Sequence, residues 1–119
     1  MQTVEELLSE VRQALSRHPY YGRYETISRG THYGKFRLII NNEFFVQINR
    51  NETASLTNFA LIHGTQRIYG RDEYRGNWHR HPVAASESHD RSPEGSQSVS
   101  LTEFLAEVDA LLRARGLVS

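Results

Sequence analysis

Residues 36–49 read FRLIINNEFFVQIN, two apolar runs on either side of Asn41-Asn42. Asparagine tolerates the positive φ angles of tight turns, so this pair is typical of a β-hairpin. After the turn, every second residue is a large apolar one: Phe44, Val46 and Ile48. This period of two predicts a strand that buries one face.

The sequence on both sides continues the strand pattern. RYETISRG, from Arg23, and YGKFRLII, from Tyr33, predict two strands with Gly30-Thr31 as turn residues. Beyond the polar stretch NRNETAS, the segments LTNFALIHG and TQRIYGRDEY predict a fourth and a fifth strand that form another hairpin at Gly64. We therefore expect an antiparallel sheet of about five strands.

Helices are predicted at both ends of the chain, over residues 4–17 and 101–115. Thr3 with Glu6, and Ser100 with Glu103, have the spacing of a capping box, and apolar residues then recur on one helical face. Strands between two helices predict an α+β fold, with the helices covering one face of the sheet. The expected core residues are Leu8, Val11, Phe44, Val46, Ile48, Leu105 and Val108.

Length and composition favour one domain, residues 1–119, without cofactor motifs. The chain has no cysteine, which excludes disulfides, thiolate metal sites and cysteine nucleophiles. Glycine-rich phosphate loops and the common hydrolase motifs are absent, so we expect no nucleotide cofactor. The N-terminal MQTVEELLSEV is unlike a signal peptide and no apolar run is long enough for a membrane span, so we expect a cytoplasmic protein.

One segment departs from the packing pattern. Residues 76–93, GNWHRHPVAASESHDRSP, hold the only tryptophan and half of the six histidines. Residues 83–100 lack a hydrophobic period and are rich in Ser, Glu and Gly, which predicts an exposed loop. We therefore expect a histidine-containing loop over residues 76–100, and function is often located in such loops.

The residues of this segment suggest phosphodiester chemistry. His79, His81 and His89 are candidate catalytic residues, because two imidazoles suffice as general base and general acid without a metal. Guanidinium groups would bind the phosphate and a nearby indole would flank a base, so the candidate substrate-binding residues are Arg71, Arg75, Arg80 and Trp78. This pattern is consistent with a metal-independent ribonuclease.

Three alternatives use the same residues. The histidines, with carboxylates from Asp72, Glu87 or Asp90, would offer nitrogen and oxygen ligands to a metal. A structural alternative has solvent-facing histidines and arginines, with Trp78 closing the end of the sheet. A non-catalytic protein would dock a partner through the Trp78 loop. A catalytic site requires the three histidines to converge within a few ångströms, whereas a docking loop does not.

The chain also resembles a known family. The tyrosine-rich QRIYGRDEY, then WHRHP, then a spaced histidine and the amphipathic SLTEFLAEVDALL resemble the small TumE-type toxins of prokaryotic toxin-antitoxin pairs, over roughly residues 23–113. The matching residues are Tyr69, Arg71, Asp72, His79, His81 and His89. The resemblance implies a bacterial or archaeal cytoplasmic toxin with a helix-turn-helix antitoxin as partner. RNA as its target is what the histidine and arginine residues suggest.

Overall fold

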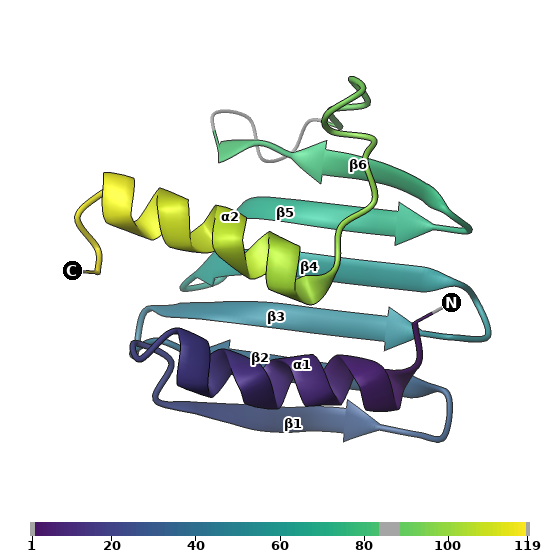
Figure 1. Ribbon diagram of the computed structural model, residues 1–119, viewed down its shortest axis with the longest axis horizontal. Coiled ribbons are helices and arrows are strands. Elements are labelled where there is room, and N and C mark those ends of the chain that lie inside the picture. The colour runs from purple at the N-terminus through teal and green to yellow at the C-terminus, as the bar shows by residue number, and fades with distance from the viewer. Residues whose placement is uncertain (1, 84–88, 119) are drawn as a thin grey trace.

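The computed structural model describes residues 2–83 and 89–118 and confirms the α+β fold. Six antiparallel strands lie side by side in chain order, one more than expected, and both helices lie in front of the same face of the sheet (Figure 1). The elements are α1 (Val4–Arg17), β1 (Arg23–Arg29), β2 (Tyr33–Ile39), β3 (Phe44–Asn51), β4 (Leu56–His63), β5 (Gln66–Tyr74), β6 (Asn77–His81) and α2 (Leu101–Ala114).

The hairpin of residues 36–49 is confirmed, but its turn is built differently from the prediction. Neither Asn41 nor Asn42 has a positive φ, and the connection between β2 and β3 is four residues long. The Asn41 carboxamide oxygen accepts hydrogen bonds from the backbone N–H groups of Glu43 (2.8 Å) and Phe44 (3.0 Å). Asparagine therefore stabilises this turn by mimicking a backbone carbonyl rather than by adopting a left-handed conformation.

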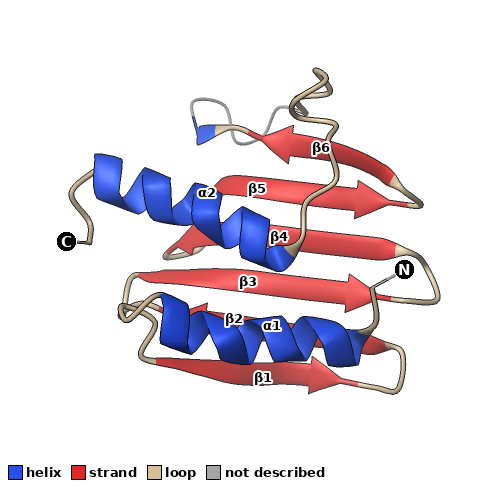
Figure 2. Cartoon of the chain, in the orientation of Figure 1, coloured by secondary structure: helices blue, strands red, loops and turns tan. Residues whose placement is uncertain are grey.

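Successive side chains along each strand point to opposite faces of the sheet. The helices cover one face, and we call the other the uncovered face. On β3, Val46 and Ile48 are fully buried, and they lie opposite Leu61 and Phe59 of β4. All seven predicted core residues are buried in one cluster with the helices. The helices and strands form two layers (Figure 2), so one face of the sheet packs against α1 and α2 while neither helix covers the other face.

Both helices begin as predicted. Each capping box is complete, with the side chains of Thr3 and Ser100 accepting from the third residue of their helices. α2 ends at Ala114, one residue before the predicted end, and Gly116 follows with a φ of 68°. No helix in the described part of the chain has both the length and the apolar character needed to cross a membrane.

The sixth strand corrects the prediction of a loop from residue 76. Arg75 (φ 53°) and Gly76 (φ 83°) form a two-residue turn, and β6 then pairs with β5 from Tyr74↔Asn77 to Gly70↔His81. Positive φ at both central residues gives the twist that such a hairpin needs. The segment after it is not simply an exposed loop either, because Asp90 bridges β6 and Gly95 is buried.

Candidate functional site

The side chains of β6 point alternately to the two faces of the sheet. His79 lies across from Asp72 and His81 across from Gly70, on the uncovered face. Trp78 and Arg80 alternate with them and face the helices, as their partners Glu73 and Arg71 do. The two histidines of the HRH sequence therefore share one side, as expected for an extended segment.

A single backbone bridge brings the third histidine to the same place. Arg80 and Asp90 exchange N–H···O bonds of 3.0 and 2.8 Å, so the chain pairs briefly with the free edge of β6. The alternation of side chains then places His89 on the side of His79 and His81. The ring centroids are 4.5 Å apart for His79–His89, 4.7 Å for His81–His89 and 5.0 Å for His79–His81. We call these three residues the histidine cluster.

Hydrogen bonds on both ring nitrogens hold His81 in one orientation. Arg67 Nη2 lies 3.1 Å from His81 Nδ1, and Asp72 Oδ2 lies 2.9 Å from His81 Nε2. A guanidinium can only donate, so Nδ1 is the acceptor and Nε2 carries the proton that is donated to Asp72. His81 is buried and fixed in one tautomer, which suits a residue that positions its neighbours.

His79 is suited to accept a proton. Its Nε2 lies 3.5 Å from Asp72 Oδ2, and its side chain is 15% exposed. Burial lowers the pKa of His79 below the ordinary value near 6.5; Asp72 raises it, and His89, His81 and Arg91 lower it further. His79 is consequently neutral at pH 7, the form that a general base requires.

Asp72 connects the cluster to the centre of the uncovered face. Its Oδ1 accepts a hydrogen bond from the Asn58 side-chain amide. Its Oδ2 accepts one from His81 Nε2 and lies 3.5 Å from Arg67 Nη1. A Cβ at position 70 would lie 3.2 Å from Arg67 Cδ, so glycine there leaves room for the Arg67 side chain to reach His81. The carboxylate thus has a fixed place beside two imidazoles.

Sequence reasoning missed Arg67 because of an irregularity in β5. Arg67 and Asp72 are five residues apart, a spacing that puts side chains on opposite faces of a regular strand. The register shifts between Leu61↔Tyr69 and Ile62↔Arg67, which leaves Ile68 as an extra residue. This β-bulge turns Arg67 to the uncovered face. The alternation of the sequence alone carries no signal for it.

Arg71, predicted to bind phosphate, has a structural role on the covered face instead. Its side chain is 2% exposed, and Nη2 and Nε donate to the carboxylate of Glu107 on α2 at 2.7 and 3.1 Å. Its Nη1 donates to the backbone carbonyls of Glu94 and Gly95. Tyr69 also donates to Glu107, at 2.7 Å. Arg71 therefore ties α2 and the preceding segment to β5, away from the histidines.

The other two predicted arginines also lie apart from the cluster. Arg80 faces the helices, where Nε and Nη2 bind one carboxylate oxygen of Asp90. The hydrogen bonds from Ser92 and Arg80 lower the pKa of Asp90 to about 2. Arg75 lies in the turn before β6 with its guanidinium 5.2 Å from the centre of the Tyr74 ring. Both arginines therefore serve the local structure of the β5–β6 region.

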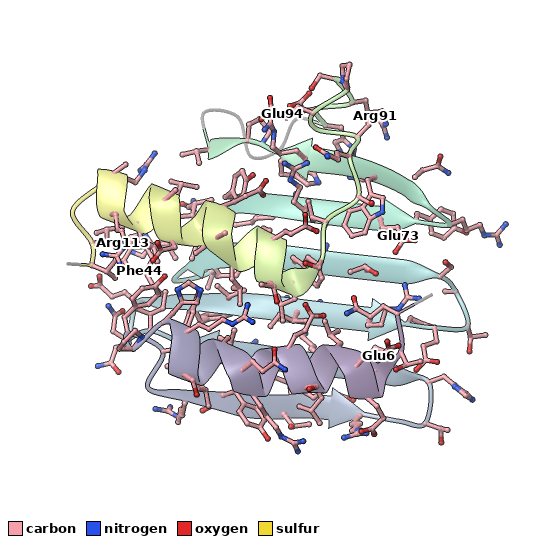
Figure 3. All side chains as sticks on the ribbon, viewed as in Figure 1. Glu6, Phe44, Glu73, Arg91, Glu94 and Arg113 are labelled. Atoms are coloured by element: carbon pink, nitrogen blue, oxygen red, sulfur yellow. The ribbon has the colours of Figure 1, made fainter. Side chains whose placement is uncertain are left out.

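Trp78 packs against the core, as the structural alternative expected. Its ring centroid is 6.3 Å from that of Phe59, and it is only half-buried. Its exposed edge lines a hollow of about 490 Å³ that His79 and Arg91 also border. Arg91 lies on the segment that follows β6, in the upper part of the molecule (Figure 3). It makes no ion pair with the described residues, and the sequence did not single it out.

The three histidines are also close enough together to be candidate metal ligands. One ligand atom from each histidine lies within 4.8 Å of the others. Tetrahedral zinc with bonds of about 2.0–2.1 Å keeps its ligand atoms about 3.3 Å apart, and Asp72 Oδ2 is 2.9 and 3.5 Å from Nε2 of His81 and His79. Asp90, one of the three alternative carboxylates of the metal hypothesis, binds Arg80 instead, and Glu87 lies outside the described residues.

No family model, curated protein or solved structure matches the chain. The resemblance to TumE-type toxins therefore rests on the residues quoted from the sequence.

Proposed function

We propose that the histidine cluster is a metal-independent acid–base site that cleaves RNA. The observation that supports this proposal is the convergence of three imidazoles on one face, with His79 neutral and His81 fixed between Asp72 and Arg67. His79 and His89 stack at 4.5 Å with ring planes 13° apart, and His89 is exposed. These two side chains are close enough to act on one phosphodiester.

The reaction needs only two proton transfers. His79 removes the proton of a ribose 2′-hydroxyl, and the 2′-oxygen attacks the adjacent phosphorus. The bond between phosphorus and the 5′-oxygen breaks, and His89 in its protonated form donates a proton to that leaving oxygen. The products are a 2′,3′-cyclic phosphate and a free 5′-hydroxyl, and no water, metal or cofactor is consumed.

The charge that develops on the phosphate requires a cation near His79. Arg91 has this position, because it borders the same hollow as His79 and its charge acts on the His79 imidazole. It is exposed and makes no ion pair with the described residues, so its guanidinium is available to an oxyanion. Arg91 thus takes the role that the sequence suggested for Arg71, Arg75 and Arg80.

Product analysis tests this mechanism. We expect the protein to cleave a labelled RNA in the presence of a chelator, leaving a 2′,3′-cyclic phosphate, and the His79→Ala, His89→Ala double variant to be inactive. Products with a 5′-phosphate, cleavage that stops with the chelator, or full activity of the double variant would each contradict the proposal.

A second candidate function is metal binding by the same residues, favoured by the separations among Asp72 Oδ2 and the Nε2 atoms of His79 and His81. Arg67 opposes it, because its donation to His81 Nδ1 keeps Nε2 protonated and its charge repels a dication. Calorimetry with Zn²⁺ separates the two candidates. Stoichiometric binding that His89→Ala weakens supports the metal site, and no binding at millimolar Zn²⁺ excludes it.

We further propose, from the sequence resemblance, that the protein is a toxin with a helix-turn-helix antitoxin as its partner. A toxin that acts through the histidine cluster arrests the growth of cells that express it, whereas the His79→Ala, His89→Ala variant does not. Equal growth of cells with either protein, or equal arrest, would contradict this role.

A further inference from the structure

We propose that the uncovered face of the sheet holds the substrate: a single strand of RNA crosses β2 to β5 and enters the histidine cluster with one base in a hollow over β3, β4 and β5. This inference rests on the proposed function and adds the surface that presents RNA to it. The observations that support it are a polar hollow, an unsatisfied arginine and a charge balance that suits a polyanion.

The hollow adjoins the histidine cluster. It has a volume of about 370 Å³ and is lined by Gln47, Asn58, Ala60, Ile62, Thr65, Gln66 and Arg67. Arg67 and Asn58 both contact Asp72, so the hollow and the site share two residues. Amide side chains can donate and accept at once, which suits the edge of a base. Ala60 and Ile62 supply the apolar floor.

Arg37 lies across β3 from this hollow and has an unfilled hydrogen-bonding position. Among the described residues, its buried Nε has no hydrogen-bond partner, and the guanidinium makes a single long hydrogen bond, 3.5 Å, from Nη2 to Gln47. The guanidinium lies 4.6 Å from the centre of the Phe45 ring. A phosphate oxygen would accept a hydrogen bond from the unsatisfied Nε, and a neighbouring base would stack on the aromatic ring.

The charges on this face favour an anionic ligand. Lys35, Arg37 and Arg67 face outward from β2 and β5, and neither Lys35 nor Arg37 forms an ion pair with a described residue. Among the residues that the structure describes, the strand carboxylates on this face are Asp72, which belongs to the site, and Glu25, which pairs with Arg23 at 3.0 Å. A protein partner would be expected to bury a more apolar surface than these amides and cations offer.

The geometry allows one strand to span the face. Strands lie about 4.8 Å apart, so the four spacings from β2 to β6 cover about 19 Å. A strand bound to Arg37, with a base in the hollow beside Gln47, would reach the histidine cluster over Arg67. The phosphate contacts would position the chain, and the amides would select among bases.

Binding of an uncleavable RNA tests this surface apart from the chemistry. The probe is a fluorescent 2′-O-methyl oligonucleotide of about 12 nucleotides, a length within the range of known single-strand sites, which lacks the attacking hydroxyl. We expect Arg37→Gln to weaken binding at least threefold and to reduce the slope of log K against log salt by about 0.7, the value for one phosphate contact in a single strand. The matched control is Arg17→Gln, an exposed arginine on α1, which should bind as the wild type does.

The outcomes separate the two proposals. Unchanged binding by Arg37→Gln, an equal loss with Arg17→Gln, or no binding of the probe by the wild type overturns the RNA surface and leaves the cleavage site standing. Binding that depends on Arg37 in a protein without RNA cleavage overturns the proposed chemistry and leaves the surface standing. A dimer in light scattering that Arg37→Gln dissociates shows that a second copy of the chain covers this face instead, which also overturns the proposal.

Discussion

The two faces of the β5–β6 hairpin use the same residue types in opposite ways. On the covered face, Arg71 and Arg80 are held by Glu107 and Asp90, and both pairs fasten later parts of the chain to the sheet. On the uncovered face, His79, His81 and His89 cluster together, Asp72 contacts His79 and His81, and Arg67 supports His81. Arg71 and Asp72 are adjacent in sequence, yet one is structural and the other belongs to the site.

This difference indicates that pairing and burial, rather than residue type, distinguish the charged residues that hold the fold together from those of the candidate site. A buried arginine with a bidentate carboxylate has its donors occupied and is unavailable to a substrate. Imidazoles packed against each other, without a helix above them, retain the capacity to exchange protons. Substitutions on the covered face and on the uncovered face test this division.

The largest expected effect on stability comes from the packing of α2. Leu105 is 2% exposed in the core, so Leu105→Ala should lower the free energy of unfolding by roughly 2–5 kcal/mol through lost burial and a cavity. Urea denaturation measures this loss. Leu117→Ala is the matched control, since Leu117 is 42% exposed and its truncation should cost less than about 1 kcal/mol. Equal losses in the two variants would contradict the assigned core.

A smaller loss is expected when the pair beneath α2 is broken. Glu107→Ala leaves the buried Arg71 guanidinium without its carboxylate, which should cost about 3 kcal/mol, the lower end for a broken buried pair because Glu107 is 30% exposed. Glu94→Ala removes an exposed carboxylate 3.5 Å from Arg80 and should cost at most about 1 kcal/mol. If the Glu107 variant were as stable as the Glu94 variant, Arg71 would not be the structural anchor described above.

The smallest effect is a pH dependence from the uncovered face. The pKa of His79 is lower in the folded protein than its ordinary value near 6.5, so below that pH the unfolded chain binds a proton more readily. The contribution of His79 is therefore complete above pH 6.5 and is lost as the pH falls through the folded pKa. Wild-type protein should lose more stability than His79→Ala between pH 7 and pH 5 in urea titrations, and an identical loss would show that burial does not disfavour the charged imidazole.

The periodic parts of the structure could be predicted from the sequence, and the site could be predicted in part. The hairpin of residues 36–49, the capped helices and the seven core residues follow from local period and capping. β6 was missed because it is short and begins at an Arg75-Gly76 turn, which has glycine but not the usual asparagine or aspartate before it.

The members of the histidine cluster were predicted, but their supporting residues were not. His79 and His81 share a face by strand alternation, which a sequence reveals once the segment is known to be extended. A β-bulge turns Arg67 towards them. Arg71 and Arg80 instead bind the carboxylates of Glu107 and Asp90, which are 36 and 10 residues further along the chain. Such long-range partners depend on how the elements pack, and local patterns do not encode them.

The most direct test compares RNA cleavage by two variants of the same hairpin. His79→Ala removes the proposed base and should lower the rate at least about 100-fold, the contribution typical of general base catalysis, while the melting temperature stays within a few degrees. Arg75→Asn removes the positive charge from the turn, and asparagine tolerates the φ of 53° at this position. This variant should cleave RNA at a rate within about twofold of the wild type. Full activity of His79→Ala, or an equal loss in Arg75→Asn, would contradict the assignment of function to the uncovered face.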